Sequence, residues 1–237
     1  MESIVEAENI ELIVENNRVL GDLFTIATQP LSLDEMLGQC VDTLLNLSWL
    51  SLLPKAGVFL ADQNDFGESI LRLAVNRNLD HEVMSLCNEV EFGECLCGQA
   101  ALTKKPIHTS CINDLHTTSY EGMEPHGHYC IPIMSGEIVL GVLVFYLPDG
   151  TAQNVDQLEF LSRCTSVLSL AIELRKKERE LEVKNRVLIS QQDALKQAQN
   201  VAKMGSWSLD VVSNHLIWSD EIFKIFGIDP LKFEASL

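Results

Sequence analysis

Cysteine and histidine are concentrated in one short part of the chain. Residues 95–130 hold four of the seven cysteines and four of the six histidines of the 237-residue sequence. They include CLCGQAA, from Cys95 to Ala101, and EPHGHYC, from Glu124 to Cys130. Thiolate and imidazole are the ligands that suit zinc, iron and copper, and four converging donors can complete a tetrahedral site. The concentration predicts a metal or redox site rather than packing alone.

The most suggestive ligand set is Cys95, Cys97, His126 and His128. Residues two apart in an extended segment project to the same face, so the two histidine rings can lie together if this part is a strand. The two thiols can do the same just before the helix that is expected to start at Gly98. The C-x-C and H-x-H spacings are less specific than the paired C-x₂-C of zinc ribbons. Zinc or iron is expected, and haem is a close alternative because one histidine or cysteine suffices as its axial ligand.

A long polar loop, residues 111–127, separates the two motifs and supplies further candidates for cofactor binding. Cys111 and His116 can act as extra ligands, or His116 can lower the pKa of Cys111 and make it a redox-sensing thiol. Tyr120 and Glu121 can form hydrogen bonds with a ligating imidazole that fix its tautomer. Loops of this length are usually functional or mobile.

The remaining cysteines and histidines have simpler interpretations. A buried cysteine behaves as a small hydrophobic residue, so those on helical or apolar segments are expected in the core. Cys130 lies in an apolar strand and fits either packing or chemistry. The expected core cysteines are Cys40, Cys87 and Cys164, and the histidines expected at or near the surface are His81, His108 and His215.

The overall composition excludes several classes of function. The chain has 17 basic and 34 acidic residues, and a net charge of −17 repels nucleic acid and anionic lipid. The longest apolar run, Ile138–Leu147, is too short to cross a bilayer and predicts a buried strand. The N-terminus lacks the basic start and apolar core of a secretory signal, so a cytoplasmic location with free thiols is expected.

The elements that must position these residues follow from hydrophobic periodicity. Apolar residues recur every seven positions up to residue 28, and Ser32 with Glu35 has the spacing of a capping box at the start of a second helix. An α+β fold is predicted, with a central antiparallel sheet covered by helices. The expected strands are 56–62, 69–75, 106–109, 129–135 and 137–148, and the expected short helices are near 81–87 and 98–103.

The C-terminal third differs in character. No proline or glycine occurs from 154 to 203, and leucines recur every seven residues, which predicts a coiled coil and a homodimer formed through helices. Beyond Lys203, two strand-like runs flank a turn around Asn214, and Ser219 is placed to cap a short helix ending at Gly227. Such a short piece cannot close its own core, so a partial domain is expected, with an output domain missing.

The order of elements, together with IPIMSGEIVLGVLVFYLPDG, resembles the GAF domain over roughly residues 20–175. CLCGQAA with YEGMEPHGHYCIPI is similar to a subset found in bacterial and archaeal sensor proteins. The segment with Gly205, Trp207, Trp218 and Gly227 resembles the opening of a PAS domain. The resemblance implies a non-enzymatic sensor of a small ligand or redox state, in a histidine kinase or cyclic-di-nucleotide enzyme. The expected parts are a helix (1–28), a GAF domain (29–175), a signalling helix (176–203) and a partial PAS domain (204–237).

Two alternatives remain open. Free methionine-R-sulfoxide reductases are GAF-type enzymes, and LCG at Cys97 with HGHYC at Cys130 is similar to their cysteine motifs, although the acidic residue that follows the second cysteine there is absent. A GAF domain that binds a cyclic nucleotide or another small molecule without metal is the other alternative. Bilin attachment is not expected, because no Cys-His dipeptide occurs.

Overall fold

The computed structural model describes residues 2–213 and 215–229 and divides the chain into two units, Met1–Lys176 and Lys177–Leu237. The first unit contains a six-stranded antiparallel sheet with the order β3-β2-β1-β6-β5-β4. This confirms the predicted α+β fold. The strands are β1 Ala56–Gln63, β2 Ser69–Arg77, β3 Glu89–Glu91, β4 Ile107–Thr109, β5 His126–Ser135 and β6 Ile138–Pro148. The helices are α1 Glu2–Thr28, α2 Leu33–Leu45, η1 Ser48–Leu50, α3 His81–Leu86, α4 Cys95–Thr103 and α5 Val155–Ala202.

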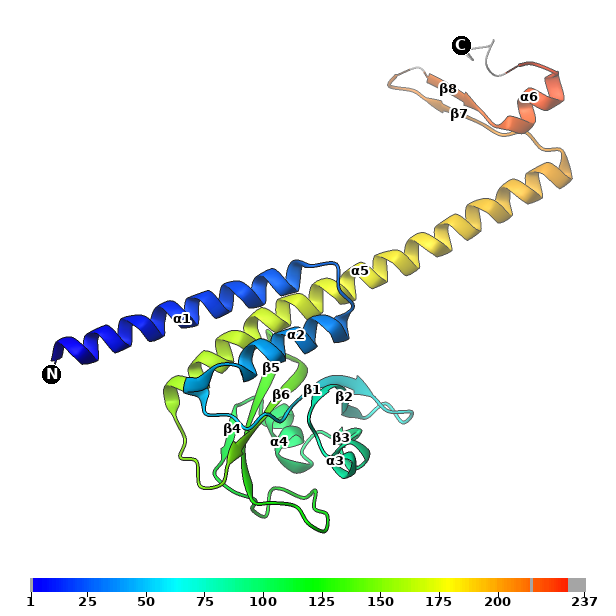
Figure 1. Ribbon diagram of the computed structural model, residues 1–237. Coiled ribbons are helices and arrows are strands. Elements are labelled where there is room, and N and C mark those ends of the chain that lie inside the picture. The colour runs from blue at the N-terminus through cyan, green and yellow to red at the C-terminus, as the bar shows by residue number, and fades with distance from the viewer. Residues whose placement is uncertain (1, 214, 230–237) are drawn as a thin grey trace. The chain divides into compact units, whose positions relative to one another are not determined.

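Helices α1, α2 and the first part of α5 cover one face of the sheet (Figure 1). The capping box predicted for α2 is present: the Ser32 hydroxyl accepts from the Glu35 amide, and the Glu35 carboxylate accepts from the Ser32 amide. Fully buried aliphatic and aromatic side chains fill the space between these helices and the sheet. We call this layer the helix-side core; it includes Leu23, Leu37, Cys40, Tyr129, Ile131, Phe145 and Cys164.

A second core lies on the opposite face of the sheet, beneath α3, α4 and the loop 110–125. We call this layer the loop-side core; it includes Phe59, Cys87, Val90, Cys95, Cys97, Cys130, Val144 and Tyr146. Successive side chains of a strand point to opposite faces, so β5 contributes Tyr129 to the helix-side core and Cys130 to the loop-side core. One strand therefore contacts both layers.

Two element boundaries differ from the prediction and both affect the site. The helix expected from Gly98 begins at Cys95, so Cys95 and Cys97 lie in its first turn and not before it. Gly98 is inside the helix because α4 passes close to β3: a Cβ at this position would lie 2.2 Å from the carbonyl oxygen of Glu91. Strand β5 begins at His126, three residues earlier than expected, and pairs with β4 and β6 over that length.

The second unit contains the remainder of α5, a hairpin of β7 Trp207–Asp210 with β8 His215–Trp218, and helix α6 Asp220–Phe226. Ser219 is at the N-cap position of α6, but its hydroxyl accepts from the Ser206 amide instead of capping the helix. Gly227 ends α6 in the left-handed conformation, as predicted. The predicted turn residue Asn214 and the segment 230–237 of the expected PAS fragment lie outside the described residues.

Within residues 2–213 and 215–229, no helix is both long and apolar enough to cross a membrane.

Candidate metal and thiol site

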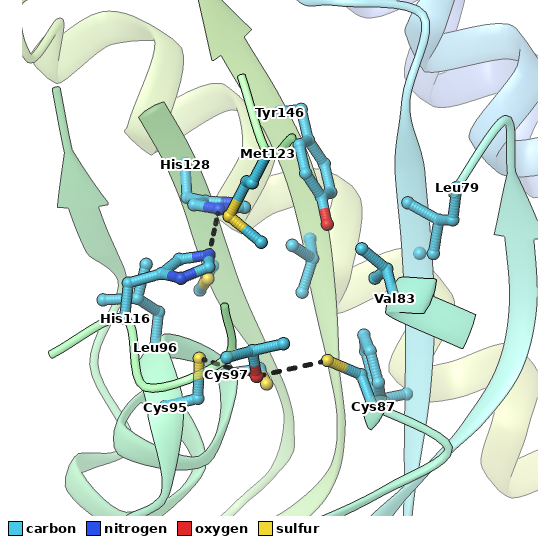
Figure 2. Close-up of a pocket in the computed structure, with 15 residues that line it drawn as sticks. Leu79, Val83, Cys87, Cys95, Leu96, Cys97, His116, Met123, His128 and Tyr146 are labelled. Atoms are coloured by element: carbon cyan, nitrogen blue, oxygen red, sulfur yellow. Dashed lines mark hydrogen bonds between the residues drawn. The ribbon is translucent and has the colours of Figure 1, made fainter. Parts of the chain in front are cut away.

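A cavity of about 40 Å³ lies in the loop-side core, between the sheet, α3, α4 and the loop 110–125 (Figure 2). This volume admits a metal ion or a few water molecules, because one water needs roughly 10–15 Å³ of such space. Its lining is unusually rich in sulfur and imidazole. The residues of these types are Cys87, Cys95, Cys97, Cys130, Met123, His116 and His128.

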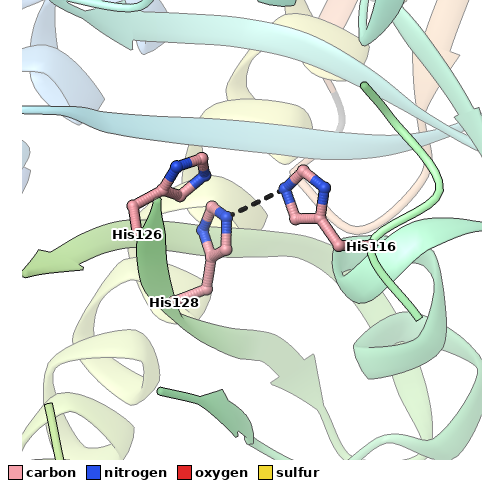
Figure 3. A group of neighbouring side chains, drawn as sticks. All are labelled: His116, His126 and His128. Atoms are coloured by element: carbon pink, nitrogen blue, oxygen red, sulfur yellow. Dashed lines mark hydrogen bonds between the residues drawn. The ribbon is translucent and has the colours of Figure 1, made fainter. Parts of the chain in front are cut away.

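Three imidazoles come together beside the cavity, which His116 and His128 line (Figure 3). One ring nitrogen each of His116, His126 and His128 lies within 4.8 Å of the other two. The Nε2 atoms of His116 and His128 are 3.1 Å apart. Bonds of about 2.0–2.1 Å to a tetrahedral zinc ion put two nitrogen ligands about 3.3 Å apart, so the His116–His128 pair is already near ligand spacing. The wider separations, up to 4.8 Å, would have to shorten for all three nitrogens to bind one ion.

The backbone of β5 explains why two of these rings share a face. His126 and His128 are two residues apart on a strand, are 8% and 3% exposed, and have ring centroids 4.7 Å apart. The residue between them cannot carry a side chain, because a Cβ at Gly127 would lie 2.4 Å from the carbonyl oxygen of Thr109 on β4. The close passage of β4 therefore requires the glycine between the two histidines. The prediction that an extended segment presents both rings together is confirmed.

The hydrogen bonds and burial of the histidines favour the neutral, metal-binding form. His126 Nδ1 donates to the carbonyl oxygen of Glu124 at 2.7 Å, which leaves the Nε2 lone pair free. This Nε2 is buried and has no hydrogen-bond partner among the described residues. Burial lowers the pKa of His126, and burial with the neighbouring rings of His126 and His116 holds the pKa of His128 well below its usual range. Neutral imidazole is the form that binds metals.

The thiols lie beside the imidazole cluster but do not belong to it. Cys95, the first residue of α4, has a left-handed backbone with φ of 51°, which an ordinary residue rarely adopts. Its sulfur accepts hydrogen bonds from the Cys97 thiol and from the Thr118 hydroxyl at 3.8 Å. The same hydroxyl lies 3.4 Å from the Cys87 sulfur, so Thr118 bridges the two cysteines (Figure 2).

These contacts shift the pKa values of the cavity thiols in opposite directions. The hydrogen bond from Cys97, with help from the Thr118 backbone and His116, lowers the pKa of Cys95 to about 4 although burial opposes the shift. The pKa of Cys97 is raised well above its ordinary value by the same pairing and by burial. Burial also raises the pKa of Cys130. Among the cavity cysteines, Cys95 is therefore the one whose surroundings favour the thiolate.

An outer polar contact holds the loop over the cavity. The Tyr120 hydroxyl donates to Asp80 at 2.6 Å, and Lys55 Nζ contacts both oxygens of the same carboxylate at 2.9 and 3.1 Å. The Tyr120 hydrogen bond lowers the pKa of Asp80, and Asp80 in turn raises the pKa of Tyr120 to about 12. We call this group the Tyr120 latch. It ties the loop that carries His116 to the start of α3.

The structure thus brings together most of the residues predicted from the sequence, in a different grouping. Cys95, Cys97 and His128 line one cavity, and His126 packs against His128. His116, expected as a secondary ligand, belongs to the imidazole cluster in place of the two thiols.

The other loop candidates have different surroundings from those expected. Cys111 is exposed and does not line the cavity. Tyr120 donates to Asp80 and not to an imidazole, and the carbonyl of Glu124 fixes the His126 tautomer. Glu121 is exposed at the outer rim.

Sequence reasoning missed several functional contacts. Cys87 was expected in the core; it is buried there but also lines the cavity. Thr118 and Met123 reach the cavity from the loop, where no periodicity indicates which side chains point inward. Nothing in the sequence indicated that Asp80 contacts the loop, because its partner Tyr120 is forty residues away. A useful signal was present only for Cys87, which lies eight residues before Cys95.

Comparisons with known proteins agree on the type of fold. A family model of the GAF domain matches residues 30–173. The GAF domain of a phosphoenolpyruvate-protein phosphotransferase from Coxiella burnetii superposes with a TM-score of 0.59 at 19% identity, over 70% of this chain and 96% of that one. Free methionine-R-sulfoxide reductase from Neisseria meningitidis, in complex with its substrate, gives 0.56 at 16% identity, over 69% and 91%. The GAF domain of nlh2 from A. aeolicus gives 0.53 at 18% identity, over 69% and 99%.

Comparison with curated proteins gave no match. At identities below one fifth, the structural likenesses describe the shared fold and carry no information about ligand or reaction.

Proposed function

Because the chain belongs to the GAF domain family, a family of regulatory and sensory domains, we propose that it senses its stimulus through a transition metal held by His116, His126 and His128. The observation that carries this proposal is the convergence of three largely buried imidazoles at the edge of a small cavity, each with a buried ring nitrogen that has no hydrogen-bond partner among the described residues. The proposed setting is a signal-transduction protein such as a sensor histidine kinase or a cyclic-di-nucleotide enzyme.

The donor set fits zinc or iron. Three neutral imidazoles suit either ion, and three protein ligands leave one position for water, a small ligand or the Cys95 thiolate. The cavity of about 40 Å³ is much smaller than the 300–1,000 Å³ that organic ligands usually occupy. Haem or a cyclic nucleotide would require the loop 110–125 to move away, so a bare ion is the better fit.

Because side chains alternate between the two faces of β5, this strand can connect the site to helix α5. His128 faces the cavity, and the next residue, Tyr129, is fully buried on the other face. Its hydroxyl donates to Gln157 Oε1 at 3.0 Å and accepts from the Asn154 amide at 3.2 Å, both at the start of α5. Gln157 also donates to the Trp49 carbonyl at 2.8 Å. A shift of β5 when metal binds or is lost would therefore act on the N-terminal end of α5. Allostery requires an element with two arrangements, and α5 is the element proposed for this role.

The proposal includes a homodimer formed through α5. Large apolar side chains recur at heptad spacing on this helix and are about half exposed in the single chain. Pairing with a second copy would bury them. They are Leu174, Leu181, Leu188 and Leu195, which are 47%, 60%, 55% and 59% exposed.

The decisive experiment measures metal content. The full chain is purified without oxygen, and zinc, iron, copper and nickel per chain are determined together with the visible spectrum. We expect close to one ion per chain, and a strong decrease in the variants His116→Ala and His126→Ala because each loses one ligand. His81→Ala is the matched control, since this histidine is exposed on α3 and is not part of the cluster.

Metal content that is unchanged in both cluster variants, or far below one ion per chain after reconstitution with zinc and with ferrous iron, would refute the metal proposal. A Soret band would show that haem occupies the site instead.

A thiol enzyme is the second candidate, and one observation favours it: Cys97 and Cys130 line the same cavity. The neighbour from N. meningitidis is a reductase of free methionine sulfoxide, and such chemistry needs a nucleophilic and a resolving thiol. The raised pKa of both residues speaks against either as nucleophile in this conformation. Turnover of free methionine-R-sulfoxide with a thiol reductant, lost on Cys97→Ser, would establish this function.

A further inference from the structure

The Cys95 and Cys97 side chains both line the wall of the cavity, although residues two apart in a helix normally project to different sides. The left-handed backbone of Cys95, with φ of 51°, removes it from regular helical geometry. A non-glycine residue in this region costs of order 1–2 kcal/mol, and such costs are typically found at functional sites.

Hydrogen-bond donors converge on the Cys95 sulfur. The Cys97 thiol and the Thr118 hydroxyl both donate to it, and the Leu96 amide contributes as well. No other cysteine among the described residues has this arrangement: Cys40 and Cys164 lie in the helix-side core, and Cys111 is exposed. Donors of this kind favour the thiolate, which is the nucleophilic form of cysteine.

The adjoining cavity is of the size of a very small oxidant. Its volume of about 40 Å³ exceeds the space for one water and matches a molecule such as hydrogen peroxide. Larger organic substrates are excluded while the Tyr120 latch holds the loop in place.

We propose that Cys95 and Cys97 form a peroxide-sensitive dithiol, in which Cys95 is oxidised first and Cys97 then closes a disulfide with it. The inference rests on the proposed sensory function and identifies a hydroperoxide as a stimulus of the same pocket. The partner for the disulfide is Cys97 and not Cys87, because Cys97 lines the same cavity from the first turn of α4, whereas the Thr118 hydroxyl lies between Cys95 and Cys87.

The chemistry balances with a hydroperoxide as the only oxidant. The Cys95 sulfur attacks one peroxide oxygen, the O–O bond breaks, and the other oxygen leaves as alkoxide or hydroxide and takes up a proton. The Cys97 sulfur then attacks the Cys95 sulfenic acid; the S–S bond forms, the S–O bond breaks, and hydroxide leaves as water with the Cys97 proton. Two thiols are oxidised, and the peroxide is reduced to an alcohol or water with one further water.

Oxidation would also change the contacts of the loop. The Thr118 hydroxyl donates to the Cys95 sulfur, and a disulfide sulfur is a much weaker acceptor than a thiolate. Thr118 is two residues from His116, so a loss of this contact acts on the segment that carries one of the proposed metal ligands.

The test treats the full chain with hydrogen peroxide, both with zinc added and after chelation. A trap for sulfenic acid is applied to the Cys97→Ser variant, and the wild type is mapped without reduction. Cleavage after Glu94 and after Lys104 separates Cys95 and Cys97 from Cys87 and Cys111, so a Cys95–Cys97 disulfide appears as the loss of two hydrogens from the peptide that begins at Cys95. We expect a Cys95–Cys97 disulfide in the wild type that thiols reverse, and sulfenic acid at Cys95 in Cys97→Ser.

Two matched variants keep the result interpretable. Cys111→Ser removes an exposed thiol and should leave the reaction unchanged, whereas Thr118→Val removes one donor and should slow the oxidation of Cys95 roughly tenfold. Circular dichroism confirms that each variant folds. Oxidation of Cys111 or Cys87 as fast as that of Cys95, or a disulfide other than Cys95–Cys97, would overturn the inference.

Failure of this inference and failure of the metal proposal are distinguishable. Stoichiometric metal in a protein whose Cys95 and Cys97 resist peroxide would overturn the dithiol alone. A normal disulfide in chelated protein whose three histidines bind no metal would support the dithiol and overturn the metal site.

Discussion

The two faces of the sheet carry cores of opposite chemical character. In the helix-side core, Cys40 and Cys164 are fully buried among aliphatic side chains, and burial raises the pKa of each to about 12. In the loop-side core, Cys95 is almost as buried, yet its pKa is lowered to about 4 by Cys97 and its other neighbours. Burial alone therefore does not decide how a cysteine behaves.

The contrast follows from what covers each face. The helices on one side satisfy their own backbone hydrogen bonds and present mostly apolar side chains, so Cys40 and Cys164 lie in surroundings that disfavour a charge. On the other side, a loop and the first turn of a short helix bring hydroxyl, amide and imidazole groups to the cavity. The same sheet thus has one structural face and one face able to do chemistry.

The largest expected effect tests this difference between thiols directly. At pH 7 the thiolate fractions of Cys95 and Cys164 differ by about 10⁵ for pKa values of about 4 and about 12. In the native, metal-free protein we expect iodoacetamide to modify Cys95 at a rate that changes little between pH 6 and 8, since the thiolate is already fully formed. Cys40 and Cys164 should stay unmodified, as followed by peptide mass spectrometry.

Unfolding the protein in urea should remove the difference, because all thiols then have ordinary pKa values. Equal modification of Cys95 and Cys164 in the folded state would mean that the two cores do not differ as described.

The second prediction concerns stability. Here a substitution in the helix-side core should have a larger effect than one in the loop-side core. Phe145→Ala empties a fully buried position in the helix-side core and should lower the free energy of unfolding by about 3–5 kcal/mol. Cys130→Ala, on the neighbouring strand and facing the loop-side core, removes only one sulfur and should cost much less. Urea unfolding of both variants measures this; similar losses would show that the loop-side core also supports the fold.

The sequence predicted the helix-side core better than the site, and for a physical reason. Hydrophobic periodicity and helix capping depend on residues that are close together in the sequence. The strands, the capping box at Ser32 and the shared face of His126 and His128 could therefore be predicted. His116 and Thr118 lie on a loop without periodicity, and their positions depend on distant partners. The thiols were misplaced because Gly98 was taken as a helix start, whereas it is a close contact with the backbone of β3.

The third prediction tests the connection between the two cores. Tyr129→Phe removes the hydroxyl that bonds to Gln157 and to the Asn154 amide, which leaves a buried polar group unpaired and should cost about 1–3 kcal/mol. Metal content should remain unchanged, because the tyrosine ring faces away from the imidazole cluster. Hydrogen exchange at the start of α5 should respond to metal in the wild type and lose this response in the variant.

A metal response at α5 that survives in Tyr129→Phe would show that another contact connects the two cores.

The smallest effect is a dependence of stability on pH in the chelated protein. The pKa of His128 is far below its usual range in the folded state, through burial and the rings of His126 and His116, so the unfolded chain binds the proton first as pH falls. The free energy of unfolding should therefore be constant above about pH 6.5 and decrease below it, by at most about 1.4 kcal/mol per pH unit for one such group. Comparison of urea midpoints at pH 7.5 and 5.5 should show a smaller decrease for His128→Gln than for the wild type. The exposed His81 provides the control, because His81→Gln leaves the loop-side core intact; an equal decrease in all three proteins would assign the acid sensitivity to groups outside the imidazole cluster.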